Sequence, residues 1–120
     1  MSNKMTYDKG NVFNKIIAGH ILADKVYEDE KILAFHDINP AAQIHILVIP
    51  KSEYTDYGDF IKNATAEDIA HYFTKIDEII EKLAISPNCY RLITNKGAQA
   101  NQTVMHFHTH IIAGNNLPNH

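Results

Sequence analysis

One long helical pattern among short strand-like runs is the feature that most constrains this fold. Downstream of Thr65, apolar side chains recur at three- and four-residue intervals, as on the buried face of an amphipathic helix. They are Ile69, Tyr72, Phe73, Ile76, Ile79, Ile80 and Leu83. Thr65 and Asp68 resemble a capping box at the start of this helix, which should end before Pro87. Because only one long helix is available, a doubly wound parallel sheet is not expected.

Five short runs are typical of β-strands, because they are rich in β-branched and apolar residues and are bounded by turn residues. They are residues 25–28, 31–37, 44–49, 89–94 and 105–112. The run 44–49 is expected to be a buried central strand, and 12–17 a short helix that ends before Gly19. Segment 54–63 has no clear period and is expected to be a loop. The sequence thus predicts an α+β fold, a five-stranded antiparallel sheet with one short and one long helix.

Composition limits the classes of function. The 120 residues are expected to form a single domain (1–120), with a polar leader at 1–11 and a tail at 115–120. The longest apolar run is well below the roughly 20 residues that cross a bilayer, and no secretory signal is visible, so we expect a cytoplasmic protein without a membrane partner. The net charge of −3 offers no positive field to polymeric nucleic acid. The single cysteine excludes an intrachain disulfide and any Cys-x-x-Cys zinc site.

The histidines carry the main functional signal. Three of the eight, His106, His108 and His110, alternate with other residues in the last expected strand. Since alternate side chains of a strand share one face, the three imidazoles are expected to point the same way, at repeats of about 6.6–6.8 Å. Such a row gives up apolar packing and brings titratable groups together, which favours a functional site.

Two chemistries could use this row. Imidazole is a common zinc ligand and His-x-His can supply two ligands, with His45 or Asp37 as a third, but nothing in the sequence requires this and no metal or cofactor is expected. The alternative is nucleophilic catalysis, in which an imidazole nitrogen attacks phosphorus. Asn95, Gln102 and Thr103 lie upstream of the row, and their amides and hydroxyl can bind phosphate without arginine. Their position favours nucleophilic catalysis.

Segment 102–112, Gln-Thr-Val-Met-His-Phe-His-Thr-His-Ile-Ile, resembles the signature of the histidine triad family, His-x-His-x-His followed by two apolar residues. Segments 12–17, 35–40 and 45–51 occur in the order and spacing of the Hint-like branch of that family. The resemblance extends from about Val12 to Gly114 and so covers almost the whole chain.

This resemblance implies a homodimer whose two sheets join into one ten-stranded sheet, with a purine nucleotide site in each subunit. The implied activity is hydrolysis of purine nucleoside 5′-phosphoramidates, or of related nucleoside monophosphate esters, through a covalent nucleotidyl-histidine intermediate without a metal. His108 would be the nucleophile, His106 would position it through its backbone carbonyl, and His110 and His45 would complete the network around the phosphate. The implied substrate contacts are Asp37 at the ribose, Val12, Phe13, Ile16, Phe35, His36 and Ile38 at the base, and Asn95, Asn101, Gln102 and Thr103 at the phosphate or leaving group.

Two positions depart from the family pattern, because Asn101 and Thr103 stand where the family usually has Gly and Ser. Asparagine tolerates positive φ better than most non-glycine residues and threonine keeps the hydroxyl, so the loop is expected to keep its shape. Two other functions stay open. One is a dinucleoside polyphosphate hydrolase, which also cuts at an α-phosphorus, and the other is a nucleotide-binding regulatory or scaffold protein with little turnover.

Overall fold

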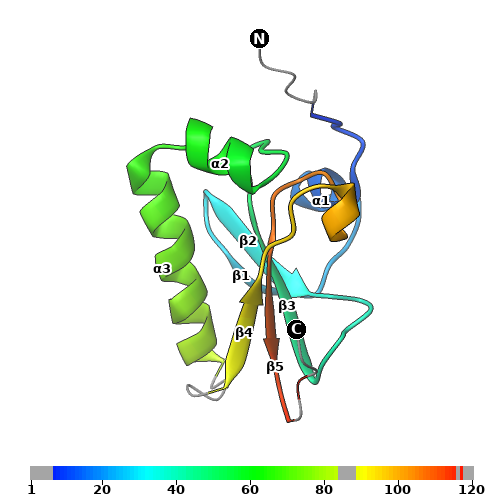
Figure 1. Ribbon diagram of the computed structural model, residues 1–120, viewed down its shortest axis with the longest axis vertical. Helices are drawn as coiled ribbons and strands as arrows, with labels where there is room; N and C mark the ends of the chain where they lie inside the picture. The colour runs from blue at the N-terminus through cyan, green and yellow to red at the C-terminus, as the bar shows by residue number, and fades with distance from the viewer. Residues whose placement is uncertain (1–6, 84–88, 116, 118–120) are drawn as a thin grey trace.

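A computed structural model describes residues 7–83, 89–115 and 117 of the chain. The elements within these ranges are α1 (Val12–Ile17), β1 (Lys25–Glu28), β2 (Ile32–His36), β3 (Ile44–Pro50), α2 (Tyr57–Asn63), α3 (Ala66–Lys82), β4 (Tyr90–Ile93), a 3-10 turn η1 (Ala98–Ala100) and β5 (Thr109–Ala113). The strands form one antiparallel sheet in the order β1-β2-β3-β5-β4 (Figure 1). The α+β fold, the antiparallel five-stranded sheet and the central place of 44–49 are therefore confirmed.

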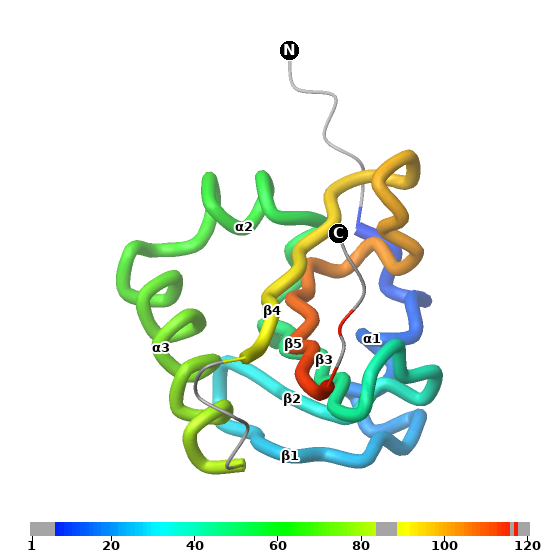
Figure 2. The backbone as a smooth tube through the Cα atoms, turned by 60° about the horizontal axis from the view of Figure 1, so that its bottom comes forward, coloured from blue at the N-terminus to red at the C-terminus, as the bar shows by residue number. Residues whose placement is uncertain are grey.

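Both faces of the sheet are covered. Figure 2 shows α3 and α1 on opposite sides of the strands. Because strand side chains alternate, Ile46 and Val48 pack beneath α2 and α3, whereas Leu47 and Ile49 pack with Phe13 of α1. This two-sided burial explains why the sequence of β3 is apolar almost without interruption.

Helix α3 begins as its sequence predicts and buries one face. The hydroxyl of Thr65 accepts a hydrogen bond from the Asp68 backbone N–H at 3.0 Å. The stripe is narrower than expected, because Phe73 and Leu83 at its margins stay 41% and 40% exposed. Pro87, expected to follow the helix end, lies outside the described residues. Across the ranges described, no helix has the length and hydropathy to span a membrane.

The expectation of a loop over 54–63 is wrong, because α2 forms there. Asp56 caps it by accepting the Asp59 backbone N–H at 2.9 Å. Phe60 is buried and stacks on Phe107 with ring centroids 4.6 Å apart. A helix of seven residues shows too few buried positions for a period to stand out, so tertiary packing on Phe107 determines this element.

The expected strand 105–112 is also too long, since β5 starts only at Thr109. Its partner β3 ends at Pro50, and the last pair in their register is Val48 with Thr109. Upstream, loops replace the ladder: the Phe107 N–H donates to the Tyr54 carbonyl at 2.7 Å. His106 and His108 therefore lie outside the hydrogen-bonded strand, and the regular repeat expected for all three histidines is replaced by a bend at His106.

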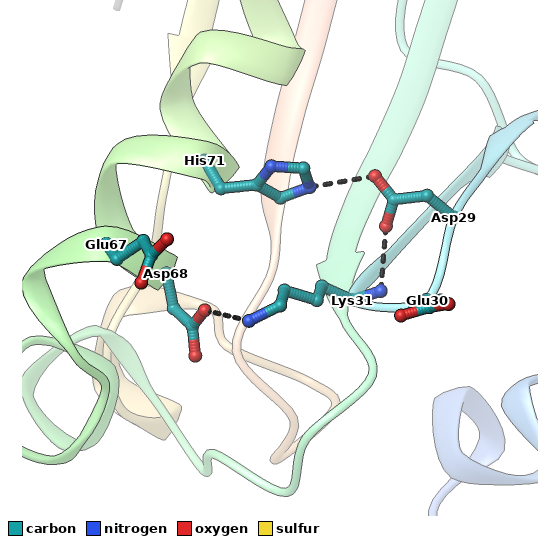
Figure 3. Close-up of a pocket in the computed structure, with 6 residues that line it drawn as sticks. All are labelled: Asp29, Glu30, Lys31, Glu67, Asp68 and His71. Carbon is teal, nitrogen blue, oxygen red and sulfur yellow. Dashed lines mark hydrogen bonds and ion pairs between the residues drawn. The ribbon is translucent and has the colours of Figure 1, made fainter.

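The turn between β1 and β2 is tied to α3 by charged side chains (Figure 3). Asp29 accepts hydrogen bonds from two backbone N–H groups of its own turn, at 2.7 and 2.8 Å. It also accepts from the Tyr27 hydroxyl at 2.9 Å and from Nε2 of His71 on α3 at 2.8 Å. Lys31 pairs with Asp68 across the same gap. Burial raises the pKa of Asp29, but these hydrogen bonds outweigh it and lower the pKa to about 2.

We expect Asp29→Ala to lower the free energy of unfolding by about 2 kcal/mol, because the variant leaves several donors without their charged acceptor. Since the folded pKa of about 2 lies below the usual 3.8, this contribution is complete above about pH 4 and is lost as the pH falls towards 2. Urea unfolding as a function of pH measures both effects. Asp68→Ala is the matched control, and it should cost much less because its ion pair is exposed. Equal losses in the two variants would contradict this account.

Candidate functional site

A cavity of about 300 Å³ opens on the α1 face of the sheet. Its walls come from α1, from the chain entering β1, from the end of β2 and from the segment that leads into β5. The lining residues are Val12, Phe13, Ile16, Ile21, Leu22, Ala23, Phe35, His36, Asp37, Ile38, Asn39, Leu47, Thr103, Val104, His108 and His110. The cavity therefore has an apolar part and a part lined by imidazoles and a carboxylate.

The apolar part is built by α1 and β2. Phe13 packs edge-on against Phe35 with ring centroids 5.6 Å apart, and against His108 at 5.0 Å. Among the lining residues, Ile38 and Leu22 are 91% and 96% exposed, so the apolar part of the cavity is open to solvent. Such walls suit a flat, weakly polar ring.

His106 and His108 are linked through the backbone rather than ring to ring. Nδ1 of His108 donates to the carbonyl oxygen of His106 at 2.7 Å, and Nε2 of His106 donates to the carbonyl oxygen of Pro50 at 2.7 Å. His106 is fully buried and is not among the cavity residues, whereas His108 is. Of the three expected rings, two line the cavity and the third supports them from behind.

His45 and His110 form a second pair. The Ala41 backbone N–H donates to Nδ1 of His45 at 3.0 Å, so the ring proton of His45 is on Nε2. That Nε2 lies 2.8 Å from Nδ1 of His110 and 3.4 Å from the Asp37 carboxylate. The His110 ring also lies beside His108, with centroids 5.1 Å apart. The two pairs thus meet at the cavity.

Burial lowers the pKa of three of these imidazoles, those of His106, His108 and His110, which favours their neutral forms near pH 7. It lowers the pKa of His106 to about 4, partly offset by the bond to Pro50. Burial, together with the neighbouring His108 and His45, lowers the pKa of His110 to about 4. The pKa of His108 is also lowered by burial, against the opposing effects of the His106 carbonyl and Asp37. A neutral imidazole has one donor and one acceptor nitrogen, so the hydrogen bonds decide which nitrogen is which.

The polar side chains of the loop before His106 were expected to contact the phosphate or leaving group, but only one of them lines the cavity. Gln102 is buried, its Oε1 accepts from the Gly97 N–H at 2.8 Å, and its Nε2 donates to the Thr55 and Val104 carbonyls at 2.8 and 3.0 Å. It holds the loop and does not line the cavity. Thr103 does line it, whereas Asn95 and Asn101 do not.

Asn101 has φ 67° and ends the 3-10 turn η1 in the left-handed conformation. This supports the expectation that asparagine can replace glycine at this position.

The structure brings the residues expected to bind a base or ribose together at the cavity. Val12, Phe13, Ile16, Phe35, His36, Asp37 and Ile38 all line the cavity. Sequence reasoning missed the supporting backbone groups of Ala41 and Pro50, which carry no side-chain signal. It also missed Tyr7, whose hydroxyl contacts His106 from the polar leader.

Among the described residues, the group whose possible ligand atoms converge is Asp37, His45 and His110, all within 4.8 Å of one another. The hydrogen bond between the two imidazoles already occupies His45 Nε2 and His110 Nδ1. A metal ion there would have to take the place of that proton, so the arrangement as it stands is a proton-linked unit.

Comparisons with known proteins identify the family of this chain. The HIT domain matches residues 18–117. An uncharacterized HIT-like protein of Rickettsia prowazekii is 52% identical over 111 residues, 92% of each chain. The structure of a histidine triad protein from Clostridium difficile aligns with a TM-score of 0.85 and 38% identity, covering 96% of this chain and 99% of the other.

A further solved structure carries a hydrolase name. A HIT family hydrolase from Clostridium thermocellum aligns with a TM-score of 0.81 and 36% identity, covering 93% of this chain and 96% of the other. With a family match over most of its length and relatives of this identity, the chain belongs to the HIT family.

Proposed function

We propose that this HIT protein hydrolyses purine nucleoside 5′-phosphoramidates, or related nucleoside monophosphate esters, through a covalent nucleotidyl-histidine intermediate. The observation that carries the proposal is the opposite character of the two imidazoles at the cavity. Nδ1–H of His108 donates a hydrogen bond to the His106 carbonyl, so in the neutral ring Nε2 has the lone pair. Nδ1 of His110 accepts from His45, which leaves the proton of His110 on Nε2. A nucleophile and a hydrogen-bond donor thus stand side by side.

This pairing suits displacement at phosphorus. His108 Nε2 forms a bond to the α-phosphorus, the bond from phosphorus to the leaving group breaks, and the leaving group takes a proton from solvent. His110 Nε2–H donates to a non-bridging oxygen as charge develops there. Water then attacks the phosphorus and loses a proton to solvent, the bond to His108 breaks, and a nucleoside monophosphate is released. The ring of His108 becomes positively charged when its Nε2 bonds to phosphorus, and the His106 carbonyl stabilises that charge by accepting the Nδ1–H that the ring already carries.

The rest of the cavity accommodates a nucleoside. The apolar walls around Phe13, Phe35 and Ile38 offer a slot for a purine ring. In this proposal Asp37, which directly follows β2 and lines the cavity, accepts hydrogen bonds from the ribose hydroxyls. Thr103 lines the cavity together with Val104 and His108, and in this proposal its hydroxyl contacts the phosphate or the leaving group.

We expect His108→Ala to reduce hydrolysis of an adenosine phosphoramidate by at least roughly 1,000-fold, because the nucleophile is removed. Binding of a nucleoside monophosphate, measured by calorimetry, should stay within a few-fold, since the base and ribose contacts remain. His20→Ala, at an exposed histidine outside the cavity, is the control.

A substrate panel that includes dinucleoside polyphosphates separates a phosphoramidase from a dinucleoside polyphosphate hydrolase. Binding without turnover in the wild type would indicate a regulatory or scaffold protein instead. Undiminished turnover in His108→Ala removes the nucleophile assignment.

In the pH dependence of kcat/KM, the midpoint of the decline on the acid side is expected at a pH lower than 6.5. His108 attacks only when Nε2 is unprotonated, and burial lowers the pKa of this imidazole from its usual 6.5. Activity should therefore persist as the pH falls through 6.5 and decline only below it. The pH dependence of kcat/KM with a substrate that does not itself titrate in this range is the measurement. A limb at or above 6.5 would contradict the role given to burial.

We also propose a homodimer formed along β4. Among the described strands, β4 pairs on one side only, with β5, and Tyr90 and Leu92 on it are 38% and 44% exposed. Both lie opposite residues of β5 that face α3, so they extend the apolar face beneath that helix. The other edge, β1, is irregular and carries the Lys25–Glu28 ion pair, which discourages pairing.

Light scattering after gel filtration should give about twice the chain mass of 13.6 kDa. Leu92→Glu should shift the protein towards the monomer, because a charge would enter the apolar contact between the two β4 strands. Leu22→Glu, at a similarly exposed leucine just before β1 at the opposite edge, should leave the mass unchanged. A wild-type monomer, or an unaffected Leu92→Glu dimer, would show that β4 is not the interface.

A further inference from the structure

We propose that Tyr7 is a positioning residue: its hydroxyl holds the His106 ring from the side opposite Pro50 and so keeps the His106 carbonyl aimed at His108. This inference rests on the proposed function, in which His108 is the nucleophile. It gives a role to Tyr7 of the polar leader, which the proposed mechanism does not use.

The geometry places Tyr7 at the second nitrogen of His106. Tyr7 Oη lies 2.5 Å from Nδ1 of His106, and the two rings meet edge to face with centroids 5.6 Å apart. The other nitrogen, Nε2, is 2.7 Å from the Pro50 carbonyl oxygen. Both ends of the ring are thus anchored, one by the leader and one by the last residue of β3.

The protonation states agree with this pairing. Nε2 of His106 must carry the ring proton because a carbonyl can only accept, so Nδ1 of the neutral ring is an acceptor. Burial raises the pKa of the Tyr7 hydroxyl, which therefore stays a donor. In wild-type protein each polar atom of this fully buried imidazole has a partner, and loss of the hydroxyl would leave Nδ1 without one.

Tyr7 reaches the proposed nucleophile only through His106. It is not among the residues that line the cavity, so it does not touch the substrate. The carbonyl of the residue it anchors accepts Nδ1–H of His108 at 2.7 Å. A His106 ring that can turn or shift would move this carbonyl, and the tautomer that leaves His108 Nε2 unprotonated would lose its support.

The start of the described chain is held in place by a turn. The Asp8 carbonyl accepts from the Asn11 backbone N–H at 3.1 Å and from its side-chain amide at 2.7 Å. Asn11 in turn caps α1 by accepting the Asn14 N–H at 2.9 Å. Phe13 of that helix packs on His106 and His108, with centroids 6.4 and 5.0 Å away. The turn that holds the chain next to Tyr7 is thus also the N-terminal cap of α1, the helix that forms one wall of the cavity.

The test compares the full chain with Tyr7→Phe, which keeps the ring and removes only the hydroxyl. In long-range proton–nitrogen NMR spectra of isotope-labelled, ligand-free protein, we expect the His106 Nδ1 resonance to move towards that of an unbonded imidazole nitrogen. We also expect His108 to lose its single Nδ1–H tautomer. With a phosphoramidate substrate, kcat should fall about tenfold while KM stays within about twofold. Tyr57→Phe is the control, because Tyr57 packs on Phe107 with centroids 6.1 Å apart and is not among the residues that line the cavity.

Unchanged His106 and His108 resonances in Tyr7→Phe would overturn the proposal. So would an unchanged kcat, or a rise in KM matched by weaker nucleotide binding, which would mean that Tyr7 contacts the substrate. If Tyr7→Phe fails to fold, the wild type alone decides, since the proposal requires an exchange-protected Tyr7 hydroxyl proton that correlates with His106 Nδ1. A wild type that cleaves nothing in the substrate panel would remove the proposed function, and the NMR comparison would still decide between a held and an unheld His106.

Discussion

A buried neutral imidazole has one N–H to donate and one lone pair to offer, and the site depends on how the fold satisfies both. Pro50 accepts the proton of His106, and the His106 carbonyl accepts that of His108. The backbone N–H of Ala41 donates to Nδ1 of His45, and Nε2–H of His45 donates to Nδ1 of His110. Backbone groups at the ends of these two chains of hydrogen bonds therefore decide which nitrogen of His108 and of His110 carries the proton and which has the lone pair.

Strand β3 holds those backbone groups in place because it is covered on both faces, and its side chains belong to the apolar clusters on each side of the sheet. One face packs beneath α2 and α3, and the other forms the floor of the cavity with α1. Pro50 ends this strand and His45 lies near its start, so a single element carries an anchor for each pair of histidines. The site is thus assembled on the most buried strand, where side chains have little freedom to move.

Much of this could be predicted from local patterns. The Thr65 cap, the apolar stripe of α3 and the β-branched run of β3 each signal their own element, because helix and strand periodicities appear directly in the sequence. The alternation of His106, His108 and His110 indicated a shared site, although the ladder of β5 begins only at Thr109. Helix α2 was missed because its stability comes from Phe60 packing on a ring 47 residues further along the chain, at Phe107.

The sequence by itself determined the α+β class and the family, and the family resemblance named many of the residues that line the cavity, since these depend on residue types and their spacing. Only the tertiary structure decided that His106 lies behind the cavity, that Gln102 braces its loop, and that Tyr7 of the leader meets a histidine near the other end of the chain. Those facts depend on backbone carbonyls and N–H groups, which every residue possesses alike. No pattern of side chains marks which of them a fold will bring to a buried imidazole, because that choice is made by long-range packing.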